Sequence, residues 1–96
     1  MPPAIIRLLD DLRTQVPRAH VRLETFDLGG TAVDISVGSR EFELFCGPQS
    51  GNGVSENHGE TLPFTQHERY FPTPEEAAAH LLALAREAAE QITHAA

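Results

Sequence analysis

The stretch TPEEAAAHLLALAREAAEQI, residues 73–92, carries the clearest helix signal of the sequence and decides the fold. Thr73 and Glu76 have the spacing of a capping box, in which the hydroxyl accepts a backbone N–H and the carboxylate reaches back. Pro74 suits the first helical position, where its missing N–H is no loss. The apolar side chains share one face of this helix: Ala77, Ala78, Leu81, Leu84, Ala85, Ala88 and Ile92. A face this wide must be covered by a sheet or by another helix.

A second helical pattern occupies residues 3–16. Its apolar side chains recur at the spacing of one buried stripe: Ile5, Leu8, Leu9, Leu12 and Val16. Pro17 ends this helix, because a proline pushes the residue before it out of the α region. The sequence therefore predicts an amphipathic helix ahead of the first strand.

From His20 the period of alternation changes to two, which is typical of a half-buried strand. In this first strand, inward residues alternate with outward ones: Val21, Leu23 and Thr25 with Arg22, Glu24 and Phe26. Two more strands are predicted at residues 31–37 and 40–46, with these inward side chains: Val33, Ile35, Val37, Phe42, Leu44 and Cys46. Glycines at 29–30 and at 38 suit tight reversals between the strands. The pattern predicts an antiparallel meander.

The lengths of the two turns set the register of these strands. A two-residue turn at 38–39 places Asp34 opposite Glu43. For the first turn we prefer a three-residue loop at 28–30 with its last glycine in the left-handed region; a bulge near Glu24 has the same effect. Either arrangement places Glu24 opposite Asp34, so that three carboxylates form one row across the strands.

The part of the chain between the third strand and the last helix has a different composition. Residues 47–59 are rich in glycine and small polar side chains, which indicates a loop. Residues 53–56 are a candidate for a short fourth strand at the sheet edge. Residues 62–71 include Leu62, Phe64, Tyr70 and Phe71, which we expect to pack irregularly beneath the last helix.

The order of elements predicts an α+β fold that forms a single domain over residues 1–96. We expect a two-layer sandwich of helix, three- or four-stranded antiparallel meander and helix, with both helices on one face of the sheet. This order resembles that of double-stranded RNA-binding domains. That family places basic residues at the start of its last helix, where this chain has Glu75 and Glu76. RNA binding is therefore not expected.

Charge and composition narrow the classes of partner and location. Fourteen acidic against seven basic residues give a net charge of −7, which argues against nucleic-acid binding and fits either solubility or a cationic partner. The single cysteine excludes an internal disulfide and suits a reducing compartment. The N-terminal residues lack the pattern of a signal peptide, and no apolar stretch is long enough to span a membrane. We therefore expect a cytoplasmic protein without membrane contact.

Motifs for catalysis or cofactor binding are weak. The glycine-rich loop lacks the lysine of a phosphate-binding loop, since the chain contains no lysine. His58 and His67 lie near acidic residues that are metal-ligand types, Glu56, Glu60 and Glu68, but their spacing matches no compact metal motif. Cys46 follows two inward strand positions and more simply ends the core. We predict no enzyme, no catalytic residue, no metal and no cofactor.

The outer face of the sheet is the candidate working surface. The preferred register gathers Glu24, Asp34 and Glu43 there, beside Phe26 and Phe45. Like charges directly opposite one another are unfavourable, so stability alone does not select such a row. The structural alternative is that these side chains spread into water, with Arg22 as a screen.

Two functional classes follow, and an oligomeric enzyme whose active site is shared between subunits is a third, weaker alternative. The first is a small acidic, non-enzymatic interaction module (an adaptor, chaperone or immunity-type inhibitor) that binds a basic partner protein through this face. The second is a small-ligand or metal-binding domain that uses the loop at residues 47–67. The sequence leaves a homodimer open.

Overall fold

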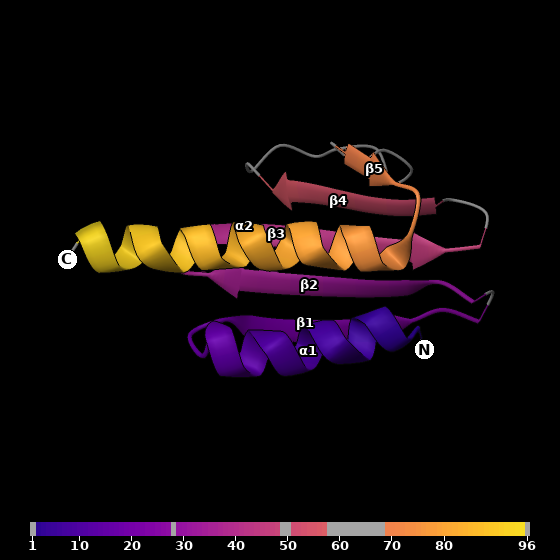
Figure 1. Ribbon diagram of the computed structural model, residues 1–96, viewed down its shortest axis with the longest axis horizontal. Coiled ribbons are helices and arrows are strands. Elements are labelled where there is room, and N and C mark those ends of the chain that lie inside the picture. Colours follow the sequence, from indigo (N-terminus) through magenta and orange to yellow (C-terminus); the bar gives the residue numbers. More distant parts are fainter. Residues whose placement is uncertain (1, 28, 49–50, 58–68, 96) are drawn as a thin grey trace.

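The structure is a computed structural model that describes residues 2–27, 29–48, 51–57 and 69–95. Along the chain, one helix precedes the five strands and one follows them: α1 (Pro3–Gln15), β1 (His20–Thr25), β2 (Thr31–Val37), β3 (Arg40–Gly47), β4 (Gly51–Asn57), β5 (Arg69–Phe71) and α2 (Pro74–Ala95). The strands form one antiparallel sheet in the order β1-β2-β3-β4-β5. Figure 1 shows α1 lying over the β1 edge and α2 over the middle of this meander.

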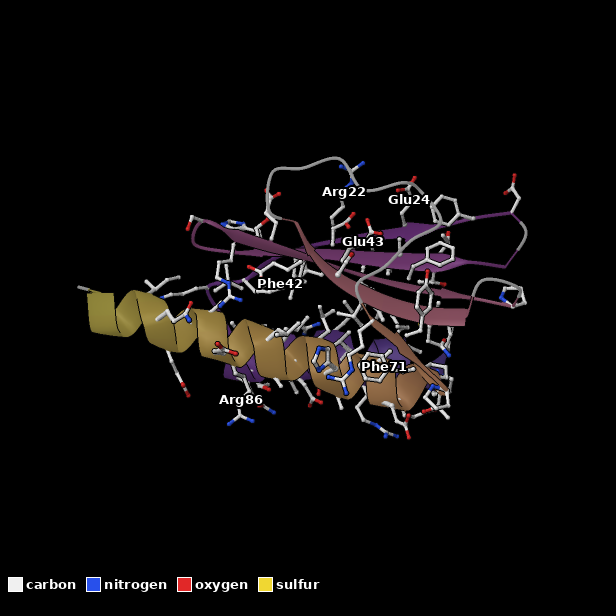
Figure 2. All side chains as sticks on the ribbon, turned by 90° about the horizontal axis from the view of Figure 1, so that it is seen from above. Arg22, Glu24, Phe42, Glu43, Phe71 and Arg86 are labelled. Atoms are coloured by element: carbon white, nitrogen blue, oxygen red, sulfur yellow. The ribbon has the colours of Figure 1, made fainter. Side chains whose placement is uncertain are left out.

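The two-layer α+β arrangement is confirmed, and Figure 2 shows the sheet as one layer with the helices as the other. The candidate fourth strand is present as β4 and is longer than expected. The fifth strand, β5, was not predicted, because a run of three residues is too short to show a period of two. Within it Phe71 is partly buried against the core, as expected, whereas Tyr70 is exposed. Leu62 and Phe64 lie outside the described residues.

The core lies between the helices and the middle strands. Ile35, Phe42 and Leu81 are almost fully buried, and they belong to a single cluster with the stripe of α1 and the alanines of α2. The apolar faces predicted for the two helices are therefore the faces that they bury. Because alanine side chains are small, the axis of α2 can approach the sheet closely.

The start of α2 follows the capping prediction. The backbone N–H of Glu76 donates to the Thr73 hydroxyl at 3.2 Å, and the N–H of Ala77 donates to the Thr73 carbonyl at 3.2 Å. The first hydrogen bond is one half of a capping box. Pro74 is the first helical residue, as expected.

Strand β1 differs from the prediction. All of its residues are exposed, including Val21 at 42 % and Leu23 at 38 %, so it is not half-buried and Leu23 is not a core residue. The reason lies in the layer beneath it, where α1 packs against α2 and leaves the helix-facing side of β1 partly open. An open groove of about 470 Å³ runs between α1 and this strand.

The reversal between β1 and β2 closes one residue earlier than predicted. The N–H of Phe26 donates to the Gly30 carbonyl at 2.9 Å, and the N–H of Gly29 donates to the Phe26 carbonyl at 3.0 Å. Gly29, with a φ of 95°, is the left-handed residue, rather than Gly30. This pattern matches a three-residue hairpin loop with a glycine bulge. It shifts the β1–β2 register by two residues and keeps every side chain on its predicted face.

Candidate interaction surface on the outer sheet face

The predicted partner-binding residues all lie on the face of the sheet that points away from the helices. Figure 2 shows Arg22, Glu24 and Glu43 directed to this outer face, whereas Phe42 lies between the sheet and α2. Alternation along each strand places Asp34 and Phe45 on the same side as Glu24, because they pair across the strands in the same phase. The shared face is therefore as predicted.

The row of three carboxylates is not formed as predicted. The register places Arg22 opposite Asp34, and Asp34 in turn opposite Glu43. Glu24 lies opposite Ala32 and is only a diagonal neighbour of Asp34. The earlier closure of the hairpin loop is the cause, because it moves β1 by two residues along β2. The surface thus consists of a carboxyl pair flanked by one arginine and one further glutamate.

The Asp34–Glu43 pair is the electrostatic feature of this surface. Loss of solvent around the Glu43 carboxyl is the largest cause that raises its pKa. A hydrogen bond with Asp34, and the negative charges of Asp34 and Glu24, raise it further. Although Glu43 as a residue is exposed, its carboxyl is held against a like charge. A cation placed between the two carboxyls would relieve this repulsion.

An aromatic pair lies next to the carboxyl pair. The rings of Phe26 and Phe45 are 5.8 Å apart between centroids and tilted by 49°, a favourable edge-to-face type of contact. The rings lie over Gly30, where an added Cβ would come within 2.8 Å of the Phe45 Cζ. Phe26 remains 44 % exposed. Gly30 thus lets the rings lie close to the backbone while one of them stays accessible.

Tyr70 extends this aromatic group, whereas the sequence had predicted that it packs beneath the last helix and not that it belongs to a binding surface. It pairs with Gly53 of β4, which in turn pairs with Phe45 of β3, so the three positions form a row across the sheet. Tyr70 is 49 % exposed. The glycine between the two rings is the signal that could have identified the row, because it leaves a gap between flanking aromatics on one face of a sheet.

An open hollow of about 390 Å³ borders the carboxyl pair on the side away from the rings. Its lining on the outer face is polar and carries both signs of charge: His20, Arg22, Asp34, Ser36, Glu41 and Glu43. This lining can donate and accept hydrogen bonds. It suits a polar or charged side chain of a partner more than an apolar one.

The other predicted candidates have structural roles or lie outside the described residues. Cys46 is buried in the core, as expected, and burial raises the pKa of its thiol to about 11, with Glu75 a smaller cause. A thiol with so high a pKa is a poor nucleophile. Of the residues proposed as metal ligands, His58, Glu60, His67 and Glu68 are not among those described. The hypothesis of a ligand site at residues 47–67 therefore stays a prediction.

Glu56, the remaining member of that set, takes part in a cluster on the helix side. Arg40 donates from Nε and Nη2 to its two carboxylate oxygens, at 2.8 and 2.7 Å, and from Nη1 to Gln91 Oε1 at 2.8 Å. The guanidinium also lies 5.0 Å from the centre of the Phe42 ring. Arg40 thereby ties β3, β4 and the C-terminal half of α2 together. Over residues 2–27, 29–48, 51–57 and 69–95, no three potential ligands gather into a metal site.

His80, on α2, is only partly exposed. Its ring lies 5.0 Å from that of Phe71, and burial together with the charge of Arg69 lowers its pKa. The neutral form is therefore favoured, and the residue packs β5 against α2.

No protein-family model, curated protein or solved structure matches this chain. Neither of the described helices has the length and apolarity that a bilayer crossing requires.

Proposed function

We propose that this protein is a small acidic, non-enzymatic interaction module whose outer sheet face binds a basic partner protein. The binding residues are three acidic residues, Glu24, Asp34 and Glu43, and the aromatic pair Phe26 and Phe45. Tyr70 joins them because the sheet register aligns it with Phe45. We place this module in the cytoplasm, where a reduced thiol is stable.

The observation that carries the proposal is the Asp34–Glu43 pair. Two carboxyls that face each other on a surface repel one another when both are ionised. Loss of solvent is the largest cause that raises the pKa of Glu43, and the facing Asp34 raises it further. An arginine or lysine of a partner would find both carboxyls already positioned and would replace repulsion with attraction. Such charge pairs contribute mainly to the rate of association and to specificity.

The aromatic pair supplies a different part of the binding energy. Phe26 is held by its contact with Phe45, so little side-chain freedom remains to be lost on binding. Exposed aromatics beside a polar rim are typical of the residues that dominate interface energies. We expect them to slow dissociation, whereas the carboxyls speed association.

The test uses Glu43→Lys and a matched control, Glu90→Lys, which makes the same change of charge on the exposed side of α2. Proteins that co-purify with the tagged parent chain at low salt are identified, and their association is measured with all three chains. Glu43→Lys should slow association about tenfold or more, and Glu90→Lys only slightly. Asp34→Lys should behave like Glu43→Lys, although it also places a second cation opposite Arg22.

A second measurement separates the two groups of side chains. Phe26→Ala should leave the association rate near that of the parent and increase the dissociation rate. If Glu43→Lys and Glu90→Lys slow association equally, net charge alone governs the encounter and the outer face is not the binding surface. Loss of binding only in variants of residues 47–67 would support the alternative ligand-loop function instead.

A further inference from the structure

Among the described residues, strand β1 pairs with β2 alone and so forms one edge of the sheet. All six of its residues are exposed. An open edge of this length is a template for pairing with another strand. Of the devices that protect unpaired edge strands, His20–Thr25 contains no proline, bulge or inward-pointing charge; its charged residues, Arg22 and Glu24, lie on the outer face.

An apolar strip runs beside this edge on the helix side. Val21 and Leu23 line the groove together with Leu9 and Leu12 of α1. Ile6, at 57 % exposure, continues the strip along α1, which lies over the same edge in Figure 1. A partner that extends the sheet at β1 would therefore also cover apolar surface that the single chain leaves in water.

The hydrogen-bonding phase of β1 identifies the residues that can pair at the open edge. The Phe26 N–H donates to the Gly30 carbonyl. In an antiparallel ladder every second pair is hydrogen-bonded, so Glu24 with Ala32, two residues further along, is also a hydrogen-bonded pair of β1 and β2. The alternate residues direct their N–H and C=O groups away from β2: Val21, Leu23 and Thr25. These three residues can form the ladder to a new strand.

The sequence of β1 is complementary to itself in one antiparallel register. With Leu23 on the two-fold axis, Leu23 faces Leu23, and Val21 faces Thr25 of the second copy. Arg22 then faces Glu24 of the second copy, and Glu24 faces its Arg22, so two opposite-charge pairs form. The arginine–glutamate positions fall at non-hydrogen-bonded pairs, where opposed side chains lie closest.

Neighbouring registers lack this complementarity. An axis at Arg22 places two arginines face to face, and an axis at Glu24 does the same with two glutamates. A two-fold axis midway between Arg22 and Leu23 would place Val21 opposite Glu24. It would also pair residues whose backbone groups point to the new strand with residues whose backbone groups point to β2. Among these registers, only the one centred on Leu23 satisfies the backbone, the charges and the apolar side chains together.

We propose that two copies of this chain form a homodimer through β1, antiparallel and with Leu23 on the two-fold axis. The two sheets become one continuous sheet, and the α1 helices lie on the same face on either side of the axis. Arg22 is then flanked by Asp34 of its own chain and Glu24 of the second copy. This inference concerns the sheet edge and does not depend on the outer-face function proposed above.

Charge reversal tests the register. Sedimentation of the full chain should show a concentration-dependent dimer, which Glu24→Arg and Arg22→Glu should each weaken about tenfold or more, because like charges then oppose one another twice. An equimolar mixture of these two variants should regain a 1:1 dimer, since each arginine again meets a glutamate. Circular dichroism shows whether each variant is folded. A parent chain that stays monomeric at high concentration, or a mixture that stays monomeric, would overturn the proposal.

A cysteine cross-link tests the axis with variants that keep every charge. Leu23→Cys should form an intermolecular disulfide under mild oxidation, because Cα atoms of a paired position lie within reach of a disulfide. Val21→Cys is the matched control: it lies on the same side of the same strand, but its symmetry mate is four residues along the ladder. The parent chain, whose only cysteine is buried, gives the background. Equal cross-linking of the two variants, or none at Leu23→Cys, would contradict the register.

Discussion

Asp34 and Glu43 face each other across β2 and β3, with Arg22 on the far side of Asp34. The arginine therefore neighbours one member of the carboxyl pair and not the other. Loss of solvent around the Glu43 carboxyl is the largest cause that raises its pKa, and the hydrogen bond with Asp34 and the negative charges of Asp34 and Glu24 raise it further. Glu43 is also the better position for substitution, because changing it leaves the Arg22–Asp34 neighbours intact.

The stability of the fold should therefore increase when Glu43 is neutralised. A pKa raised in the folded state means that the fold holds this proton more tightly than the unfolded chain does. The corresponding stability is present below the unfolded pKa and is lost as the pH rises through the folded pKa. Glu43→Gln should raise the melting temperature at pH 7 and have little effect near pH 4. Thermal unfolding of the parent and of Glu43→Gln at both pH values measures the difference.

Arg40 should be sensitive to a conservative substitution. Its guanidinium group donates hydrogen bonds to both carboxylate oxygens of Glu56 and to Gln91 Oε1, and the ammonium of a lysine cannot reproduce this planar geometry. Arg40→Lys should lower the free energy of unfolding by about 1–2 kcal/mol, measured by urea denaturation. In a double-mutant cycle with Glu56→Gln the two losses should not add. Additive losses would show that the ion pair contributes little.

The core prediction rests on Ile35 and Leu81, which belong to the same buried cluster and are at most 1 % exposed. Truncation of either to alanine should cost about 2–5 kcal/mol, because it removes buried methyl groups and leaves a cavity. Ile6→Ala, at a position that is 57 % exposed, is the control and should cost far less. Denaturation at low protein concentration keeps self-association out of the comparison. Equal losses at Leu81 and Ile6 would contradict the packing described.

The N-terminal cap of α2 is tested at Thr73. Thr73→Ala removes the acceptor of the Glu76 N–H and should cost about 1 kcal/mol. Thr73→Ser keeps the hydroxyl and should retain most of the stability. Thermal unfolding of the two variants beside the parent measures the difference. If serine and alanine are equally destabilising, the methyl group rather than the hydroxyl carries the effect.

Most of the fold could be predicted from the sequence because its apolar residues recur with periods of 3.6 and 2 residues. They located both helices and the strands with long alternating runs. They could not fix the β1–β2 register, since loops at 27–29 and 28–30 both place like faces together and differ by two residues along the strand. Period-two patterning cannot separate such registers. The predicted row of Glu24, Asp34 and Glu43 was wrong for this reason.

Burial of β1 was a different kind of error. Alternation shows which side of a strand is apolar, but whether that side is covered depends on where the helices lie. Because α1 packs against α2, Val21 and Leu23 stay exposed. Tyr70 was missed because β5 is held by pairing with β4 rather than by any local pattern. In both cases tertiary placement decided what the local sequence could not.

Because Cys46 is buried, the rate at which its thiol reacts reports how often this part of the core opens. The thiol lies in β3 beneath α2, 4 % exposed, and a pKa of about 11 keeps it protonated at neutral pH. A thiol reagent can therefore react at an appreciable rate only when the strand leaves the helix. With rapid reclosing, the alkylation rate divided by that of a free thiol gives the fraction of open molecules. This measurement of local opening needs no label and no engineered residue.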